Sequence, residues 1–299
     1  MTEQLEPIFG RVTTAMVTPF ASDDTLDLDG AVDLAKHLVD DLGTDGLVIN
    51  GTTGESPTTN DAEKRALLEA VIEAVGDRAS IVAGIGTFST KHTIELAEQA
   101  AGVGADGALV VTPYYSRPPE KDLEAHFRAV ADATDLPLML YDIPHRAGLP
   151  IPEAMLIRLA DHPNIVAVKD AKGQIASSST VMAQTTLQYY AGDDAMLLPL
   201  LAVGGVGVVG TSTHFTAPFA KDIVDAFLRG DVAEAAALNK FALPAFQGIF
   251  ATQGCMMVKA TFAARGRDVG HCRPPMGDVD PAVVETYQRI LESLEVFGE

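Results

Sequence analysis

A short apolar run that ends in a charged pair decides the fold class: Ile165–Asp170 reads IVAVKD. Its first four residues are all apolar and do not alternate with polar ones, which is typical of a parallel strand buried on both faces. Seven other runs have a similar character, so eight strands are expected: Thr14–Val17, Gly46–Asn50, Ser80–Ile85, Gly107–Val111, Leu136–Tyr141, Ile165–Lys169, Leu187–Ala191 and Val206–Gly210. They begin at intervals of roughly 20–35 residues, the size of one βα unit.

The segments between these runs carry apolar residues at helical spacing. Asp29–Leu42 has an apolar stripe, and Asn60 followed by Glu63 has the spacing of a capping box for a helix through Val75. Three later stretches repeat the pattern: His92–Val103, Leu123–Ala133 and Pro152–Leu159. Strands that alternate with helices in this way predict an α/β fold, a (β/α)8 TIM barrel over residues 10–225. A doubly wound sheet is the alternative.

The chain after the eighth strand is mostly helical. Four helices are expected there: Phe219–Arg229, Val232–Phe250, Met256–Arg265 and Pro281–Phe297. No linker composition separates them from the barrel, whereas independently folding domains are usually joined by polar or Pro/Gly-rich linkers. Residues 226–299 are therefore expected to form a C-terminal helical extension packed on the barrel.

Charge and composition exclude several classes of partner. Lys and Arg number 21 against 41 Asp and Glu, for a net charge of -20, so nucleic acid and anionic membrane surfaces are poor partners. No run of 18 apolar residues predicts a membrane span, and Met1–Pro7 lacks the basic and apolar regions of a secretory signal. The two cysteines, Cys255 and Cys272, form no CxxC motif. A reducing, cytoplasmic location is expected.

A lysine at the end of the sixth strand is the first candidate for chemistry. Active sites of such barrels lie at the carboxyl ends of the strands, where Lys169 falls. Burial disfavours the charged amine and lowers its pKa, which makes the amine a nucleophile able to form a Schiff base with a ketone. The alternatives are an ammonium that reaches solvent at the barrel mouth, or one paired with Asp170.

Two other strand ends carry reactive or binding groups. The fifth ends in Tyr141, a phenol able to move protons, followed by Arg146, whose guanidinium suits a carboxylate. The second ends in Gly51–Glu55, whose backbone N–H groups and threonine hydroxyls suit a carboxylate and a proton relay. A tyrosine that covers the core, an arginine in a surface ion pair and a simple turn before a helix are the alternative interpretations.

Three familiar motifs do not apply to this sequence. Gly205–Gly210 matches G-x-G-x-x-G, but it forms a predicted strand instead of following one, which argues against dinucleotide binding. The seven histidines have no metal-ligand spacing, so no metal site is expected. No G-x-S-x-G is present, and a serine-hydrolase elbow is therefore absent from the sequence.

Six short motifs in a fixed order carry a family resemblance. They are Thr14–Phe20 (TAMVTPF), Gly51–Ser56 (GTTGES), Val111–Tyr115 (VTPYY), Tyr141–Pro144 (YDIP), Val168–Asp170 (VKD) and Gly192–Asp194 (GDD). Each is weak alone, but the ordered set resembles the dihydrodipicolinate synthase / N-acetylneuraminate lyase family of pyruvate-dependent class I aldolases. The resemblance covers about residues 10–225, and the C-terminal part is similar more loosely.

The resemblance implies a role for each matching residue. Lys169 would form the Schiff base with pyruvate, while Tyr141, Thr52 and Tyr115 would relay protons. Tyr115 would enter the site of a neighbouring subunit, in a homotetramer built as a dimer of dimers. The Thr52–Thr53 turn would bind the pyruvate carboxylate, and the carbonyls of Gly192 and Val209 would line the pocket. No metal or organic cofactor is implied, because the lysine imine carries the chemistry.

Arg146 bears on the second substrate. Family members that act on L-aspartate 4-semialdehyde carry an arginine at this position, so a lyase-type condensation to 4-hydroxy-tetrahydrodipicolinate, in lysine and diaminopimelate biosynthesis, is the expected reaction. His145, Ala147 and Gly210 depart from the family pattern near this pocket. The alternatives are a related 2-keto-acid aldolase with another aldehyde, and a non-catalytic keto-acid binding protein.

Lysine feedback is not expected. Family members that respond to lysine carry two histidines after the GTTGES motif, and an asparagine and a glutamate after the third strand. This sequence has Asp61, Lys64, Phe88 and His92 instead. The resemblance therefore implies an enzyme insensitive to lysine.

Overall fold

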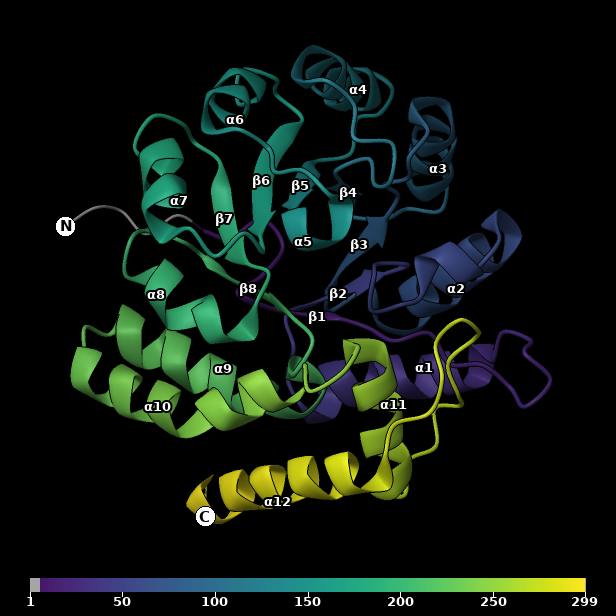
Figure 1. Ribbon diagram of the computed structural model, residues 1–299, viewed down its shortest axis with the longest axis vertical. Helices are drawn as coiled ribbons and strands as arrows, with labels where there is room; N and C mark the ends of the chain where they lie inside the picture. Colours follow the sequence, from purple (N-terminus) through teal and green to yellow (C-terminus); the bar gives the residue numbers. More distant parts are fainter. Residues whose placement is uncertain (1–5, 299) are drawn as a thin grey trace.

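Eight parallel strands form a closed barrel at the centre of the molecule (Figure 1). The computed structural model describes residues 6–298, so Met1–Leu5 of the N-terminal stretch lie outside the described residues. The strands are β1 Val12–Ala15, β2 Gly46–Ile49, β3 Ser80–Gly84, β4 Gly107–Val111, β5 Leu138–Asp142, β6 Ile165–Asp170, β7 Gln188–Ala191 and β8 Gly207–Gly210. Because β8 pairs with β1, the predicted TIM barrel is confirmed and the open, doubly wound sheet is excluded.

Helices surround the strands, as Figure 1 shows. They are α1 Leu28–Lys36, α2 Asp61–Val75, α3 Thr90–Gly102, α4 Glu120–Asp132, α5 Pro144–Ala147, α6 Glu153–Leu159, α7 Ile175–Met182, α8 Leu197–Leu201 and α9 Thr213–Leu228. The capping box predicted at Asn60 and Glu63 is confirmed, since each side chain bonds the other's backbone N–H. The sequence did not predict α7, because its run of serines favours caps and turns over helix interiors.

The predicted ends of two strands were wrong by two residues. β1 begins at Val12 because Val12 is the first residue to pair with β8, and Met16 and Val17 lie beyond the last strand residue. β5 begins at Leu138 because Pro137 has no N–H for a sheet hydrogen bond. In each case a continuous apolar run crosses the end of the strand, so composition alone does not mark the boundary.

Alternate strand residues face two separate cores. Val48, Val82, Leu109 and Met139 belong to a cluster inside the barrel, whereas their neighbours along the strands pack against the surrounding helices. Side chains two positions apart on a strand point the same way. Lys169, two residues after the inner residue Ala167, therefore points into the barrel near its carboxyl end.

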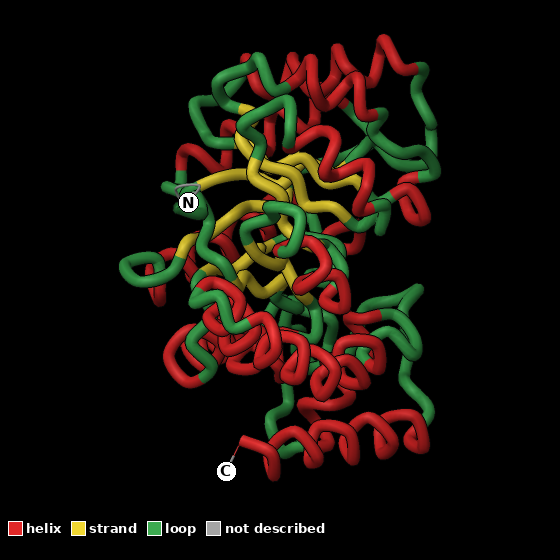
Figure 2. The backbone as a smooth tube through the Cα atoms, turned by 90° about the vertical axis from the view of Figure 1, so that its left-hand side faces the viewer, coloured by secondary structure: helices red, strands yellow, loops and turns green. Residues whose placement is uncertain are grey.

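The chain ends in α10 Val232–Gly248, α11 Gly254–Ala264 and α12 Pro281–Gly298. These helices lie together at one side of the barrel in two perpendicular views (Figures 1 and 2). The boundary expected between residues 225 and 226 falls inside α9, and the division of the chain into two parts stays a prediction. Within residues 6–298, no helix combines the length and the apolar character that a membrane span requires.

Candidate active site

Lys169 lies at the end of β6, almost fully buried. Its Nζ lies 4.5 Å from the centre of the Tyr141 ring. Burial lowers the pKa of Lys169 to about 8, with the Asp194 carboxylate opposing this shift and the Arg146 charge adding to it. The ion pair with Asp170 does not form; that carboxylate instead accepts hydrogen bonds from Ser178 and the backbone N–H of Lys172.

Tyr141 stands beside the lysine because β5 and β6 are paired in register. The register sets Tyr141 opposite Lys169, so both side chains point into the barrel. The Tyr141 phenol is hydrogen-bonded to Thr52 from the turn after β2. Burial raises the pKa of Tyr141, and the Arg146 charge and the Thr52 hydrogen bond only partly oppose this. The phenol therefore keeps its proton at neutral pH and can donate it.

The turn after β2 is held from both sides. Thr53 Oγ1 lies 3.2 Å from Thr211 Oγ1, and Thr18 Oγ1 donates a hydrogen bond of 2.6 Å to the Gly54 carbonyl. Glu55, whose φ of 55° is left-handed, is anchored by a buried ion pair in which its Oε1 lies 2.7 Å from Lys259 Nζ. Because Lys259 belongs to α11, the C-terminal helices fix a turn of the barrel.

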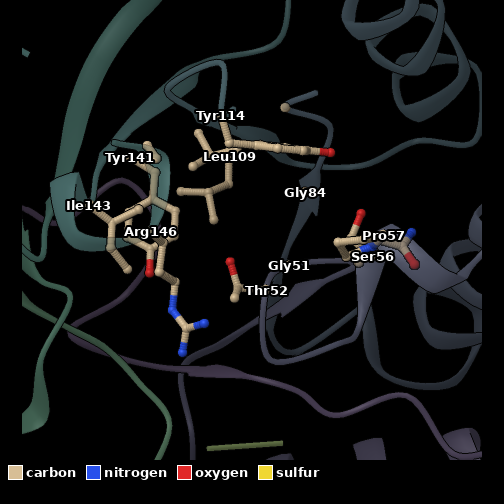
Figure 3. Close-up of a pocket in the computed structure, with 14 residues that line it drawn as sticks. Gly51, Thr52, Ser56, Pro57, Gly84, Leu109, Tyr114, Tyr141, Ile143 and Arg146 are labelled. Carbon is tan, nitrogen blue, oxygen red and sulfur yellow. The ribbon is translucent and has the colours of Figure 1, made fainter. Parts of the chain in front are cut away.

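One cavity of about 390 Å³ brings together six of the eight predicted site residues. They are Thr52, Thr53, Tyr141, Arg146, Lys169 and Gly192. An adjoining cavity of about 210 Å³ shares part of this lining, and Figure 3 shows Thr52, Tyr141 and Arg146 around it. Within the described residues, no group of three or more His, Cys, Asp or Glu side chains is placed to hold a metal ion.

Arg146 enters the cavity from the short helix α5 after β5. Its Nη2 donates a 2.8 Å hydrogen bond to Oε1 of Gln253. His145 lines the same cavity, whereas Ala147 is buried and lines only the adjoining one. The surface ion pair considered for Arg146 is not formed with any side chain that the structure describes.

Two predicted site residues lie away from this cavity. Tyr115 is 94% exposed, in a left-handed conformation with φ of 70°, while its neighbour Tyr114 lines the adjoining cavity. Val209 is buried inside the barrel in β8. The cavity lining does not include Val209, but it includes Thr211, two residues later. The predicted roles of Tyr115 and Val209 stay predictions.

The sequence interpretation missed a buried carboxylate, Asp194. It accepts hydrogen bonds from Ser212 Oγ at 2.6 Å and from the backbone N–H groups of Thr211 and Ser212. Burial raises the pKa of Asp194, although these hydrogen bonds oppose the shift. A Cβ atom at Gly210 would collide with this carboxylate, so the glycine leaves room for Asp194 in this position. The GDD motif (Gly192–Asp194) contains this aspartate, but the sequence interpretation assigned a role only to Gly192.

The C-terminal residues at the cavity were also missed. Phe250, Gln253, Cys255 and Met276 line it, yet they share no local motif with the strand ends. The C-terminal helices were predicted, but the contribution of the residues at and between them to this cavity was not. The only local signal was the string of helix-forming segments after β8, which does not say where those segments pack.

Comparisons with known proteins agree with this geometry. The sequence model of the dihydrodipicolinate synthetase family matches residues 8–294. A 4-hydroxy-tetrahydrodipicolinate synthase from Cutibacterium acnes is 55% identical over 290 residues, which cover 97% of this chain and 99% of that protein.

Solved structures give the same result. The dihydrodipicolinate synthase from Cyanidioschyzon merolae, solved with lysine bound, has a TM-score of 0.94 and 36% identity, covering 97% of this chain and 99% of its own. A monomeric dihydrodipicolinate synthase variant has a TM-score of 0.90 and 29% identity, covering 96% of this chain and 97% of its own. The chain therefore belongs to the dihydrodipicolinate synthetase family.

Proposed function

We propose that this chain condenses pyruvate with L-aspartate 4-semialdehyde and forms 4-hydroxy-tetrahydrodipicolinate, a precursor of diaminopimelate and lysine. The observation that carries the proposal is the buried Lys169 amine, 4.5 Å from the Tyr141 ring and with its pKa lowered to about 8. A neutral amine is the form that attacks a ketone. Curated relatives of more than 50% identity with this activity support it.

The first half of the reaction forms an enamine on the lysine. The Lys169 amine adds to the C2 carbonyl of pyruvate, and the resulting alcohol leaves as water once it receives a proton. Tyr141, protonated and hydrogen-bonded to Thr52, is placed to move that proton. The imine then loses a methyl proton and becomes an enamine, so no metal or organic cofactor is required.

The second half joins the two substrates. The methylene carbon of the enamine attacks the aldehyde carbon, whose oxygen takes up a proton and becomes the 4-hydroxyl group. The amino group of the semialdehyde then attacks C2, closes the ring and expels the Lys169 amine. The Thr52–Thr53 turn would bind the pyruvate carboxylate, Gly192 and Val209 carbonyls would line the pocket, and Arg146 would bind the semialdehyde carboxylate.

Turnover of pyruvate with L-aspartate 4-semialdehyde, coupled to an NAD(P)H-dependent reductase for the product, tests the proposal. Clear turnover is the expected result. If turnover is absent but borohydride traps pyruvate on Lys169, the chain is a pyruvate aldolase for another aldehyde. If neither turnover nor an adduct is found, the chain is a keto-acid binding protein and the proposal is wrong.

The surface around Tyr115 supports an assembly of several copies. Tyr115 is 94% exposed and Phe88 is 63% exposed, and Phe88 packs edge-on against Tyr114 at 5.6 Å between ring centres. Large exposed aromatic side chains gathered in this way are typical of interfaces. We propose a homotetramer built as a dimer of dimers, in the cytoplasm, in which Tyr115 acts in the partner's site.

Mixed dimers test whether Tyr115 acts on the partner. Tyr115→Phe is expected to lower kcat about 10²-fold or more by removing a proton-relay group. Co-expression of equal amounts of the Tyr115→Phe and Lys169→Ala chains is expected to restore about a quarter of wild-type activity, because random pairing makes about half of the dimers mixed and one of the two sites in each is complete. A mixture as inactive as its two parents would show that Tyr115 acts within its own chain, and a fully active Tyr115→Phe variant would show that it takes no part in the reaction.

Lysine is expected to leave the activity unchanged. The ammonium of Lys64 is buried and donates hydrogen bonds of 2.9 Å to the Ser56 carbonyl and Thr59 Oγ1, and His92 is paired with Asp61 at 3.0 Å. A fixed buried cation repels a cationic ligand. An inhibition curve measured at saturating substrates checks this, and loss of activity at low millimolar lysine would contradict it.

A further inference from the structure

Arg146 is held by a residue far away in the sequence. Its Nη2 donates a 2.8 Å hydrogen bond to Oε1 of Gln253, 107 positions later. Gln253 is the residue that precedes the first turn of α11, so its backbone is tied to the C-terminal helices. Both side chains line the cavity that contains Lys169. The guanidinium therefore takes its orientation from outside the barrel.

Because Gln253 is neutral, the positive charge of Arg146 stays available to bind an anion. Among the side chains that the structure describes, Arg146 forms no ion pair, and the atom that holds it is a neutral amide oxygen. A guanidinium has five N–H donors in a planar fork, and only one is used by Gln253. The remaining donors and the full positive charge can meet a carboxylate in two parallel hydrogen bonds.

A neutral acceptor thus differs from a carboxylate at the same place. A glutamate would hold Arg146 equally well, but it would neutralise the charge and repel an anionic substrate. An apolar side chain of the same size would leave the charge intact and the guanidinium free to rotate. Glutamine orients the guanidinium and preserves its charge, which neither replacement achieves.

We propose that Gln253 is a positioning and specificity-determining residue for the second substrate. It aims Arg146 at the cavity and so selects an aldehyde that carries a carboxylate group. Pyruvate binding does not depend on it, because the Thr52–Thr53 turn and Lys169 belong to other parts of the cavity. The inference rests on the proposed function, since it concerns the semialdehyde of that reaction.

Steady-state kinetics of Gln253→Met and Gln253→Glu test this inference. Gln253→Met is expected to raise KM for the semialdehyde about tenfold, the loss from one hydrogen bond to a charged group. Gln253→Glu is expected to raise it about 30-fold or more, because the arginine is then neutralised. In Gln253→Met, which adds no charge to the cavity, KM for pyruvate and the rate of borohydride trapping stay within about twofold of wild type.

Gln247 supplies the matched control. It lies on α10, exposed and outside the cavity lining, so Gln247→Met and Gln247→Glu should leave all kinetic constants unchanged. The inference is wrong if the Gln253 variants keep the wild-type KM for the semialdehyde, or if KM for pyruvate rises equally in Gln253→Met. Failure of wild-type enzyme to use the semialdehyde at all would instead overturn the proposed function, so the two failures are distinct.

Discussion

Replacing Lys169 with alanine is expected to lower kcat about 10⁴-fold or more, because the covalent path disappears with the amine. Borohydride should also trap no pyruvate on the variant. Both losses follow from one observation: the buried Nζ is the amine beside Tyr141 in the cavity. Turnover assays and mass spectrometry of the trapped protein measure the two effects on the same preparation.

Lys240→Ala is the matched control, since this lysine is exposed on α10, and it should keep wild-type activity and trapping. Trapping by the wild-type protein should rise with pH through about 8, where Lys169 loses its proton, and level off above. The sign follows from the neutral amine being the nucleophile. Substantial turnover by a correctly folded Lys169→Ala variant would rule out the Schiff-base mechanism.

Lys259→Met is expected to lower the free energy of unfolding by about 3–5 kcal/mol, because it leaves a buried carboxylate without its cation. Glu55 Oε1 lies 2.7 Å from Lys259 Nζ, and both side chains are almost fully buried. The ammonium also donates a 2.6 Å hydrogen bond to the carbonyl of His271 and lies 4.4 Å from the centre of the Phe20 ring. Urea unfolding, followed by circular dichroism, measures the loss.

A double-mutant cycle and an exposed pair serve as controls. The double variant Glu55→Gln with Lys259→Met should lose less than the sum of the two single losses, since no buried charge remains unpaired. Arg65→Met breaks an ion pair of 2.9 Å whose side chains are about half exposed, and it should cost less than about 1 kcal/mol. If Lys259→Met costs as little as Arg65→Met, the buried pair does not stabilise the fold.

The strands could be predicted because their burial produces a recognisable local pattern in the sequence. A strand covered on both faces excludes polar residues along its whole length, so each run, such as Gly107–Val111, is visible in the sequence and matches β4. The exact ends were less certain, because they depend on partners. Val12 is part of β1 only because β8 lies beside it, and nothing around residue 12 signals this pairing.

In the candidate site, too, some residues could be predicted from local sequence and others could not. Lys169, Tyr141 and Thr52 were found because the barrel brings strand ends together, and strand ends can be located from the sequence. Gln253 and Lys259 were not found, because their partners Arg146 and Glu55 lie 107 and 204 positions away. Contacts between residues so far apart in the sequence depend on how the helices pack, and no local spacing of residues predicts them.

The pairing of β8 with β1 governs how the chain reaches its native state. Arg11, next to β1, donates a hydrogen bond from Nη1 to the carbonyl of Val206, 195 positions later. The first strand therefore cannot complete its hydrogen bonds until the last strand has formed. Pairings this distant in sequence make folding slow, since a long loop must close first. Until residue 210 has been synthesised, a nascent chain exposes open strand edges, which are templates for aggregation. The risk of aggregation during synthesis is therefore a consequence of barrel closure itself.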